Sequence, residues 1–364
     1  MLTQFFPSRT MSFYMAKMFL LRSFAVLAAL VLVLQALDLL GESGKIMAYP
    51  GNGNAELWTY ISLRVPQIIA RFLPFSVLLG TLITLATLNQ NSEVIAMKSA
   101  GLSAHQVLAP LILASLLVAG LSFAFNDRVV ARATDTLDRW QKAEYGPLPK
   151  VRATQTNVWV REGNNLIHAA EVHGRGANIR LRDITVYDRE NDTLLTILKS
   201  PEGRFQDNGW TLDNATRFDV ATGRTTPIGT LKVGPEVRPD QFTLATVDPD
   251  GLSFVDLRSA IADLKAAGRP TSALEANLWH KISGPMSSLL MPLLGAVAAF
   301  GLARSGQLFL RAVIGMALGF TYFVADNFGL AMGNLGAYPP LLAAWGPFFL
   351  FLLIGETVLI RTEE

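Results

Sequence analysis

Long apolar stretches occupy both ends of this 364-residue chain, and a polar region with short alternating segments separates them. A bilayer crossing needs roughly 20 mainly apolar residues. Six segments reach that length, at about 18–40, 65–88, 107–125, 278–300, 309–332 and 341–360. The pattern therefore predicts three membrane-spanning helices, an insert, and three further spans, with the first apolar run retained as a span.

The insert has the texture of a β domain. Short runs of alternating apolar and polar residues are separated by turn signals, such as Gly-Asn-Asn at 163–165 and Asp-Asn-Gly at 207–209. Many short strands at regular spacing are typical of a sandwich or jelly roll. We expect a β jelly-roll-like domain with flanking helices over 126–275, between helical regions 1–125 and 276–364.

Composition agrees with a membrane protein and excludes several kinds of site. Hydrophobic residues make up 51% of the chain and charged residues only 16%, whereas soluble domains average about 25% charged. The net charge of +2 is too small to indicate a nucleic-acid partner. No cysteine is present, and the four histidines lack ligand spacing. We therefore expect no metal site.

The orientation follows from basic residues in the short loops, because lysine and arginine favour the cytoplasmic side. The side shared by both termini carries several, among them Arg9, Lys17 and Lys98. The opposite short loops carry Lys45, with Arg64 near the membrane edge. Both termini are predicted to be cytoplasmic, with the insert on the other side.

The sequence shows no nucleotide-binding or hydrolytic motif. The segment GESGKI at 41–46 resembles a phosphate-binding loop, but Leu39 stands where the motif needs its first glycine and Ile46 where it needs serine or threonine. No G-x-S-x-G motif occurs either. We expect a protein without catalytic residues, whose energy source, if it transports against a gradient, lies elsewhere.

Charged residues at membrane depth are costly and tend to face protein, water or substrate. For Asp38, Arg64 and Glu356 we favour interfacial snorkelling or local pairing. Asp326 lies near the end of the fifth span. Arg71 is deeper and has no acid nearby in the sequence, so ordinary pairing and a polar cavity or anionic ligand stay equally open for it.

The segment 92–107, SEVIAMKSAGLSAHQV, is a short, mildly amphipathic helix former between two spans, with Glu93 and Lys98 as its charges and Val94, Ile95, Met97 and Leu102 as a modest apolar face. Such a helix can lie on the membrane surface. It can also dock into a groove on a soluble partner, with Glu93 meeting a basic residue there. The lone acid beside an anionic leaflet argues against lipid binding, although spacing alone leaves both interpretations open.

These residues carry a family resemblance. The stretch LLGTLITLATLNQNSEVIAMKSAGLS resembles the second span and coupling helix of the LptF/LptG family of lipopolysaccharide-export permeases. The segments VDPDGLSFVDLRSAIADLKAAG, NLWHKISGPMSSLLMPLLGAVAAFG and FTYFVADNFG are similar to the LptG branch. The resemblance covers essentially the whole chain and is loosest in the insert.

The resemblance implies a half-permease of an ABC transporter in the inner membrane of a Gram-negative bacterium. Such a chain pairs with an LptF-like permease, binds an LptB-like ATPase dimer and works with LptC. It extracts lipopolysaccharide and passes it through a periplasmic jelly roll to an LptA-like bridge. ATP and Mg²⁺ then belong to the partner ATPase, and this chain binds no cofactor.

The resemblance also implies roles for particular residues. The ATPase-coupling segment near 92–103 would include Glu93, Ala96, Met97, Lys98, Gly101 and Leu102. Spans one and five would form a lateral gate containing Gln35, Asp38, Gly315, Gly319 and Asp326, where the Gly-x-x-x-Gly spacing is also typical of close helix packing. LptG-like chains often carry lysines at the outer end of span one, but LQALDLLGES at 34–43 has none. Contacts to lipid phosphates are therefore assigned to Lys45, Arg64 and Arg71.

Two other functions stay open at this point. An ion-driven secondary transporter of an amphipathic substrate would use Asp38, Asp326 or Glu356 as titrating sites, although these lie near span ends rather than at the midplane. A membrane-anchored scaffold would use only the β insert. Dependence on a proton gradient without an ATPase would favour the former, and sufficiency of residues 126–270 alone the latter.

Overall fold

The computed structural model describes residues 8–147, 155–162, 164–173, 179–190, 193–206, 209–233, 242, 248–266, 269–301 and 308–361. They belong to two compact units. The helical unit comprises residues 1–146, 249–261 and 270–364, and the β unit comprises 147–248 and 262–269. The predicted boundaries of 126–275 grouped the flanking helices with the insert. In the structure, the parts of these helices up to Gly146 and from 249 to Ile261 belong to the helical unit.

Six helices of the helical unit are long and apolar enough to cross a membrane, which confirms the predicted pattern of three plus three. Five of them begin or end within about four residues of the predicted span, whereas α1 extends well beyond its predicted span at both ends. They are α1 (Arg9–Ala48), α2 (Asn54–Gln90), α4 (Ala104–Phe125), α8 (Ser272–Ala296), α9 (Leu308–Asn334) and α10 (Pro340–Arg361).

The first three helices are longer than a bilayer requires. At 1.5 Å per residue, the 37 residues of α2 span about 55 Å, whereas the hydrocarbon core is about 30 Å thick. The third span continues from α4 through one π-helical turn, η2 (Asn126–Val130), into α5 (Ala131–Lys142). These helices therefore project from the membrane at one end. Residues 41–46 are helical within α1, so GESGKI forms no phosphate-binding loop.

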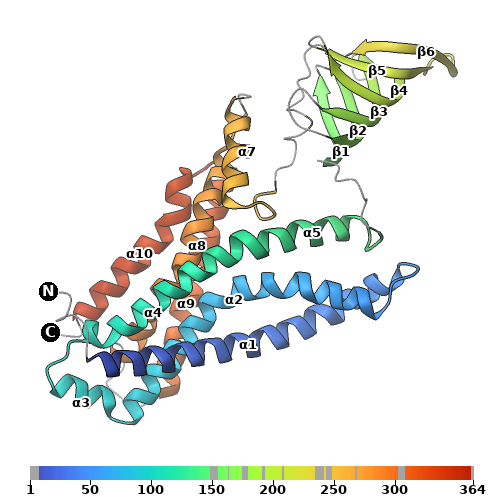
Figure 1. The fold of residues 1–364 in the computed structure, drawn as a ribbon. Helices are drawn as coiled ribbons and strands as arrows, with labels where there is room; N and C mark the ends of the chain where they lie inside the picture. Colours follow the sequence, from blue (N-terminus) through green and yellow to red (C-terminus); the bar gives the residue numbers. More distant parts are fainter. Residues whose placement is uncertain are drawn as a thin grey trace. The chain divides into compact units, whose positions relative to one another are not determined.

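The helix α3 (Glu93–Ser99), the start of α1 and the end of α10 lie at the same end of the helical unit (Figure 1). The seven residues of α3 join α2 to α4. We call this end of the unit the α3 end and the opposite one the distal end. Helices α1 and α2 lie side by side along most of their length.

The contact between α1 and α2 depends on Gly80. A β-carbon at this position would lie 2.1 Å from Ser23 Oγ and 2.7 Å from Ser23 Cα. Since one of these neighbours is backbone, no rotamer change can relieve the clash. Gly80 therefore allows the two helices to approach closely, as small residues do between membrane helices. Around it, the core contains residues such as Leu27, Val77 and Leu108.

The β unit contains one described antiparallel sheet whose strands follow the chain order β1 to β6. The strands are β1 (Gln155–Glu162), β2 (Asn165–His173), β3 (Arg180–Glu190), β4 (Thr193–Gln206), β5 (Gly209–Asp219) and β6 (Arg224–Val233). The predicted β insert and its strand pairs are confirmed. The described strands follow one another as a meander within this one sheet.

One face of this sheet is apolar. Val158 pairs with Ala169, and Val160 with Ile167, so buried side chains align across neighbouring strands. This is the period-two alternation that the sequence shows. Trp210 covers the same core and contacts Phe242, with ring centroids 4.9 Å apart. The helix α7 (Phe254–Ala266) follows β6 in the chain.

Candidate functional site

Two tight corners fix α3. Ser92, before its first residue, has a left-handed φ of 59°, and Gly101, after its end, has a φ of +87°. Nothing lies within 4 Å of a β-carbon built on Gly101, so the backbone angle rather than space favours glycine there. The amide of Leu102 donates to the carbonyl of Met97 at 3.1 Å, and Ser103 caps α4. The chain thus turns twice within a few residues.

The two sides of α3 differ sharply. Val94 and Met97 are buried and belong to the same apolar core as α2 and α4. Ile95 points away from this core and is 61% exposed. The sequence grouped Val94, Ile95, Met97 and Leu102 as one apolar face. That grouping is wrong for Ile95, because residues one apart on a helix lie about 100° apart.

The predicted coupling residues occupy distinct environments around α3. Met97 is buried in the core and holds α3 against it, and Leu102 is half-buried against the same core. Ala96, Lys98 and Gly101 are exposed. The structure therefore brings the six predicted residues together on one short segment, and four of them, including Glu93, reach its surface. Their role toward an ATPase remains a prediction.

Glu93 accepts hydrogen bonds from two neutral groups. Its Oε1 accepts from Tyr14 Oη at 3.5 Å and from Asn91 Nδ2 at 3.2 Å. Within the described part of the chain, no lysine, arginine or histidine forms an ion pair with it. Nearby, His105 Nε2 lies 3.0 Å from Glu356 Oε2 and links α4 to α10, so the local pairing expected for Glu356 is confirmed.

At the distal end, by contrast, charges are paired within the chain. Arg64 donates from Nη2 to Asp38 Oδ1 at 2.9 Å and from Nε to Asp38 Oδ2 at 3.1 Å. Tyr60 donates to the same Oδ2 at 2.5 Å. Lys45 Nζ lies 2.8 Å from Glu42 Oε1. The pairing expected for Asp38 and Arg64 is confirmed, and two of the three cations assigned to lipid phosphates already face acids.

A second set of contacts joins α1 to the end of α5. Tyr145 donates to Glu42 Oε2 at 2.6 Å, and Asn52 Nδ2 donates to the carbonyls of Ile46 and Tyr145 at 2.9 and 3.0 Å. Burial and the hydrogen bond to Glu42 raise the pKa of Tyr145 to about 12. We call Asp38, Glu42, Tyr60, Arg64 and Tyr145 the distal clamp.

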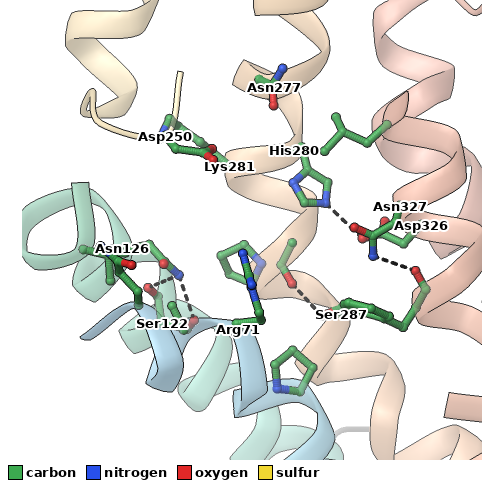
Figure 2. A pocket seen from close by; sticks show the side chains of 18 of the residues that line it. Arg71, Ser122, Asn126, Asp250, Asn277, His280, Lys281, Ser287, Asp326 and Asn327 are labelled. Atoms are coloured by element: carbon green, nitrogen blue, oxygen red, sulfur yellow. Dashed lines mark hydrogen bonds and ion pairs between the residues drawn. The ribbon is translucent and has the colours of Figure 1, made fainter. Parts of the chain in front are cut away.

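A polar pocket of about 690 Å³ lies between α2, η2, α8 and α9, where Pro249 and Asp250 also line it. Figure 2 shows Arg71 pointing from α2 into this pocket. On one wall, Asn126 Nδ2 donates to the carbonyl and the hydroxyl of Ser122 at 3.0 and 3.3 Å. All of the lining residues belong to the helical unit.

The opposite wall carries a histidine–carboxylate pair that the sequence did not predict. His280 Nε2 on α8 lies 3.0 Å from Asp326 Oδ2 on α9. Lys281 also lines the pocket. The two partners of the pair are 46 positions apart, so no local spacing signals the contact. Asp326 was recognised only as a costly residue near a span end.

Arg71 is the described cation of this pocket without an ion pair. Its side chain is exposed toward the pocket, and no carboxylate of the described residues lies within salt-bridge distance of it. Arg71 thus faces a polar cavity, which is one of the environments that the sequence left open for it.

The five residues assigned to a lateral gate are spread over α1 and α9 and do not form one cluster. Gly315 and Gly319 pack α9 against α2, since an added β-carbon would lie 2.8 Å from Leu82 Cδ2 and 2.2 Å from Leu78 Cδ2, respectively. Asp38 belongs to the distal clamp, and Asp326 to the pocket. Gln35 on α1 is buried, and its amide has no hydrogen-bond partner among the described residues. Their common role in a gate stays a prediction.

Comparison with known proteins agrees with this architecture. Residues 13–361 match the family described as lipopolysaccharide export system permease LptF/LptG. The permease protein LptG of Escherichia coli K12 is 28% identical over 311 residues, covering 83% of this chain and 84% of that protein. LptG of Haemophilus influenzae is 24% identical over 322 residues, covering 86% and 89%. The chain therefore belongs to the LptF/LptG family of lipopolysaccharide export system permeases.

Proposed function

We propose that this chain is the LptG-like half of an inner-membrane ABC transporter that extracts lipopolysaccharide and delivers it toward the outer membrane. It pairs with an LptF-like permease and an LptB-like ATPase dimer and works with LptC. The α3 end and both termini face the cytoplasm, and the β unit faces the periplasm, where an LptA-like bridge receives the lipid. ATP and Mg²⁺ bind to the partner ATPase, and this chain is not catalytic.

The observation that best supports the proposal is the difference between the buried and the exposed side of α3. Its inner side is fixed in the core by Val94 and Met97. Its outer side presents the exposed Ile95, the small residue Ala96 and the acid Glu93, which accepts hydrogen bonds from two neutral groups. An apolar residue beside an acid on a short rigid helix is complementary to a groove with a basic residue.

The same arrangement provides a route by which a displacement of α3 is transmitted to the membrane helices. The corners at Ser92 and Gly101 connect α3 directly to α2 and α4, and its buried side chains contact the same core as both helices. A displacement imposed by the ATPase therefore moves all three helices together. In the proposed mechanism, closure of the ATPase dimer narrows an apolar cavity beside α1, α2 and α9 and expels the lipid.

Ion-driven transport has less support. Each carboxylate that it would use has a basic neighbour: Asp38 binds Arg64, Asp326 binds His280, and Glu356 binds His105. Lipopolysaccharide release that needs ATP and is insensitive to a protonophore supports the ATPase-driven mechanism.

The test is Glu93→Ala in the full chain, expressed with its partner subunits. We expect at least tenfold weaker association with the ATPase, because a charged hydrogen bond contributes about 1.5–3 kcal/mol. Lipopolysaccharide release should fall in parallel. Glu162→Ala, at the end of β1 in the β unit, is the matched control and should change neither quantity. Unchanged association and unchanged release in Glu93→Ala would refute the proposal.

A further inference from the structure

A line of left-handed residues divides the sheet of the β unit into two halves. Asn157, Asp183 and Asn214 have φ values of 55°, 48° and 54° on β1, β3 and β5. The pairings on either side of them place all three at one level of the sheet. Leu181 and Ile184 are both buried although they are three positions apart, so the alternation of side chains shifts at this line. The face opposite the core, which we call the outer face, therefore has two separate halves.

In one half, the outer face consists of charged residues that pair with one another. Arg180 Nη1 lies 3.8 Å from Glu202 Oε1, and Arg204 Nη2 lies 3.3 Å from Glu202 Oε2. His173 Nε2 lies 3.0 Å from Glu171 Oε2 on the same side of β2. We call this the paired half. Polar residues that are satisfied by their neighbours are the usual covering of the solvated face of an antiparallel sheet.

The other half of the outer face carries an apolar row. Successive strands pair Leu166 with Tyr187, Tyr187 with Ile197, and Ile197 with Phe218. Trp159 on β1 reaches this row, because its ring stacks on Tyr187 with 5.7 Å between the centroids and 17° between the planes. Trp159 is 49% exposed, and Phe218 is exposed as well. The core lies on the opposite face, so an apolar row here indicates a surface that contacts another molecule.

Neighbouring rings hold the exposed indole in place. Trp159 packs against His168 on β2, with 4.6 Å between the ring centroids, in addition to its stack on Tyr187. His168 Nε2 in turn lies 2.9 Å from Asn157 Oδ1 on the dividing line. An aromatic side chain that is already held by its neighbours loses little conformational freedom when a ligand binds to it.

A polar row runs directly beside the apolar one. His168, Thr185, Lys199 and Thr216 pair in this order across β2 to β5. The two rows are about 7 Å apart, because their members are two positions apart along each strand. We call the two rows together the outer-face platform.

The charges of the platform are mainly positive. Lys199 is exposed and forms no ion pair with the described residues. Arg161 continues the apolar row on β1, where it pairs with Leu166. Neither row contains an aspartate or glutamate, and Asp183 on the dividing line is the carboxylate that borders the polar row. An acidic group of a ligand is therefore favoured beside Lys199.

A sugar chain matches two such rows. A pyranose ring has a face of C–H groups, which packs on the negative face of an aromatic ring, and a rim of hydroxyl groups. Rings stacked on Trp159 can direct hydroxyls toward the side chains of Thr185 and Thr216. An acyl chain or an apolar protein surface laid over the platform would instead cover the polar row without hydrogen-bond partners, which is costly.

We propose that the outer-face platform binds the saccharide part of lipopolysaccharide, with a sugar ring stacked on Trp159 and an acidic group of the saccharide at Lys199. The identity of the ligand rests on the proposed export function, because the exported lipid carries a phosphorylated saccharide. The platform lies on the face of the sheet opposite its apolar core, so the site recognises sugars and not acyl chains.

The experiment measures equilibrium binding of two soluble saccharides to the purified full chain, with the subunits that co-purify and without ATP. One is the saccharide obtained by complete deacylation of lipopolysaccharide, and the other is the neutral maltopentaose, which should bind several-fold more weakly. Trp159→Ala should weaken binding of the deacylated saccharide about tenfold, because it removes the central aromatic contact. Trp159→Phe should lose less, because it keeps an aromatic face. Lys199→Gln should weaken binding several-fold and reduce the preference over maltopentaose.

Each variant has a matched control elsewhere in the chain. Trp58→Ala removes another exposed tryptophan, which lies on α2 in the helical unit. Arg204→Gln removes a cation from the paired half of the same sheet. Both controls should bind the two saccharides as the wild type does. A thermal unfolding scan of every variant separates loss of binding from loss of fold.

Three results would overturn the proposal. The first is wild-type binding of the deacylated saccharide by folded Trp159→Ala. The second is Trp159-dependent binding to phosphatidylglycerol vesicles with no binding of the saccharide, which would make the platform a membrane contact. The third is loss of a co-purifying subunit from folded Trp159→Ala, which would make it a protein interface.

Failure of this proposal and failure of the proposed function can be told apart. Saccharide binding is measured without ATP, so Glu93→Ala should leave it unchanged. Trp159→Ala should leave association with the ATPase unchanged, because Trp159 lies in the β unit and Glu93 in the helical unit.

Discussion

Each end of the helical unit contains a tyrosine that donates to a glutamate, and the two pairs differ in strength. At the distal end, Tyr145 lies 2.6 Å from Glu42, and its ring is packed against Trp140. At the α3 end, Tyr14 lies 3.5 Å from Glu93, and its ring is 45% exposed. The distal bond is short and partly buried, whereas the bond at α3 is long and open to solvent.

The surrounding residues show the same contrast. The distal clamp pairs Asp38 with Arg64, so its charges are satisfied within the chain. On α3, Glu93 contacts neutral groups and Ile95 is exposed. A region whose polar groups are satisfied internally contributes to stability, and a region that leaves an acid and an apolar side chain open is complementary to another molecule. Substitutions at the two ends should therefore change different measurements.

The largest effect on stability should come from a substitution on the buried side of α3, compared with one on its exposed side. Met97→Ala removes a buried side chain from the core, and such truncations cost about 2–5 kcal/mol. Ile95→Ala truncates an exposed residue and should change stability by no more than about 0.5 kcal/mol. Thermal unfolding of the purified chain measures both. Ile95→Ala should instead weaken association with the ATPase.

The two α3 variants control for each other, since both remove apolar atoms from the same short helix. If Ile95→Ala destabilised the chain as much as Met97→Ala does, the exposed side of α3 would be part of the fold, and the contrast between the two ends would disappear. If Ile95→Ala also left ATPase association unchanged, docking through this face would lose its apolar component.

A smaller effect is expected from the distal clamp. Asp38→Ala leaves Arg64 without its carboxylate and Tyr60 without its acceptor, and we expect a loss of about 1–3 kcal/mol in unfolding free energy. Lys45→Ala is the control, because Lys45 is 67% exposed and its pair with Glu42 is a surface pair. ATPase association should be unchanged in both. Equal unfolding temperatures for the two variants would contradict the structural role of the clamp.

Local patterns were enough to predict the large elements of the fold. The six apolar runs predicted the spans, because each run is long enough by itself to cross a bilayer. The Asp-Asn-Gly turn predicted the pairing of β4 with β5, where Gln206 faces Gly209. Such signals are contained in a few consecutive residues. How strands arrange beyond their neighbours is not contained in such signals, so the meander order of the described strands could be read only from the structure.

The candidate sites divide in the same way. The segment around Glu93 was found because its charge interrupts two apolar runs. The pocket was only partly predicted, since the pairing of His280 with Asp326 depends on how α8 and α9 pack. The orientation of Ile95 was wrong because a seven-residue helix has too few positions to reveal its buried face. Contacts between segments far apart in the sequence depend on how the helices pack, and a local sequence pattern does not contain that information.

The smallest effect concerns Tyr145 and depends on pH. Tyr145→Phe keeps the ring contacts but removes the donor to Glu42, and it should cost about 1 kcal/mol at neutral pH. The pKa of Tyr145 is raised from 10.0 to about 12 by burial and by this bond. The stabilisation is therefore complete below pH 10 and is lost as the pH rises through 12, because the unfolded chain releases the phenolic proton first.

Unfolding temperatures measured from pH 8 to 12 should consequently fall more steeply for the wild type than for Tyr145→Phe, so that the two curves converge at high pH. Tyr14→Phe at the α3 end provides the comparison. It removes a tyrosine donor with a longer and more exposed bond, so its unfolding curve should stay close to the wild type throughout. Coinciding curves for wild type and Tyr145→Phe across this range would show that ring packing, rather than the bond to Glu42, holds the distal ends of α1 and α5 together.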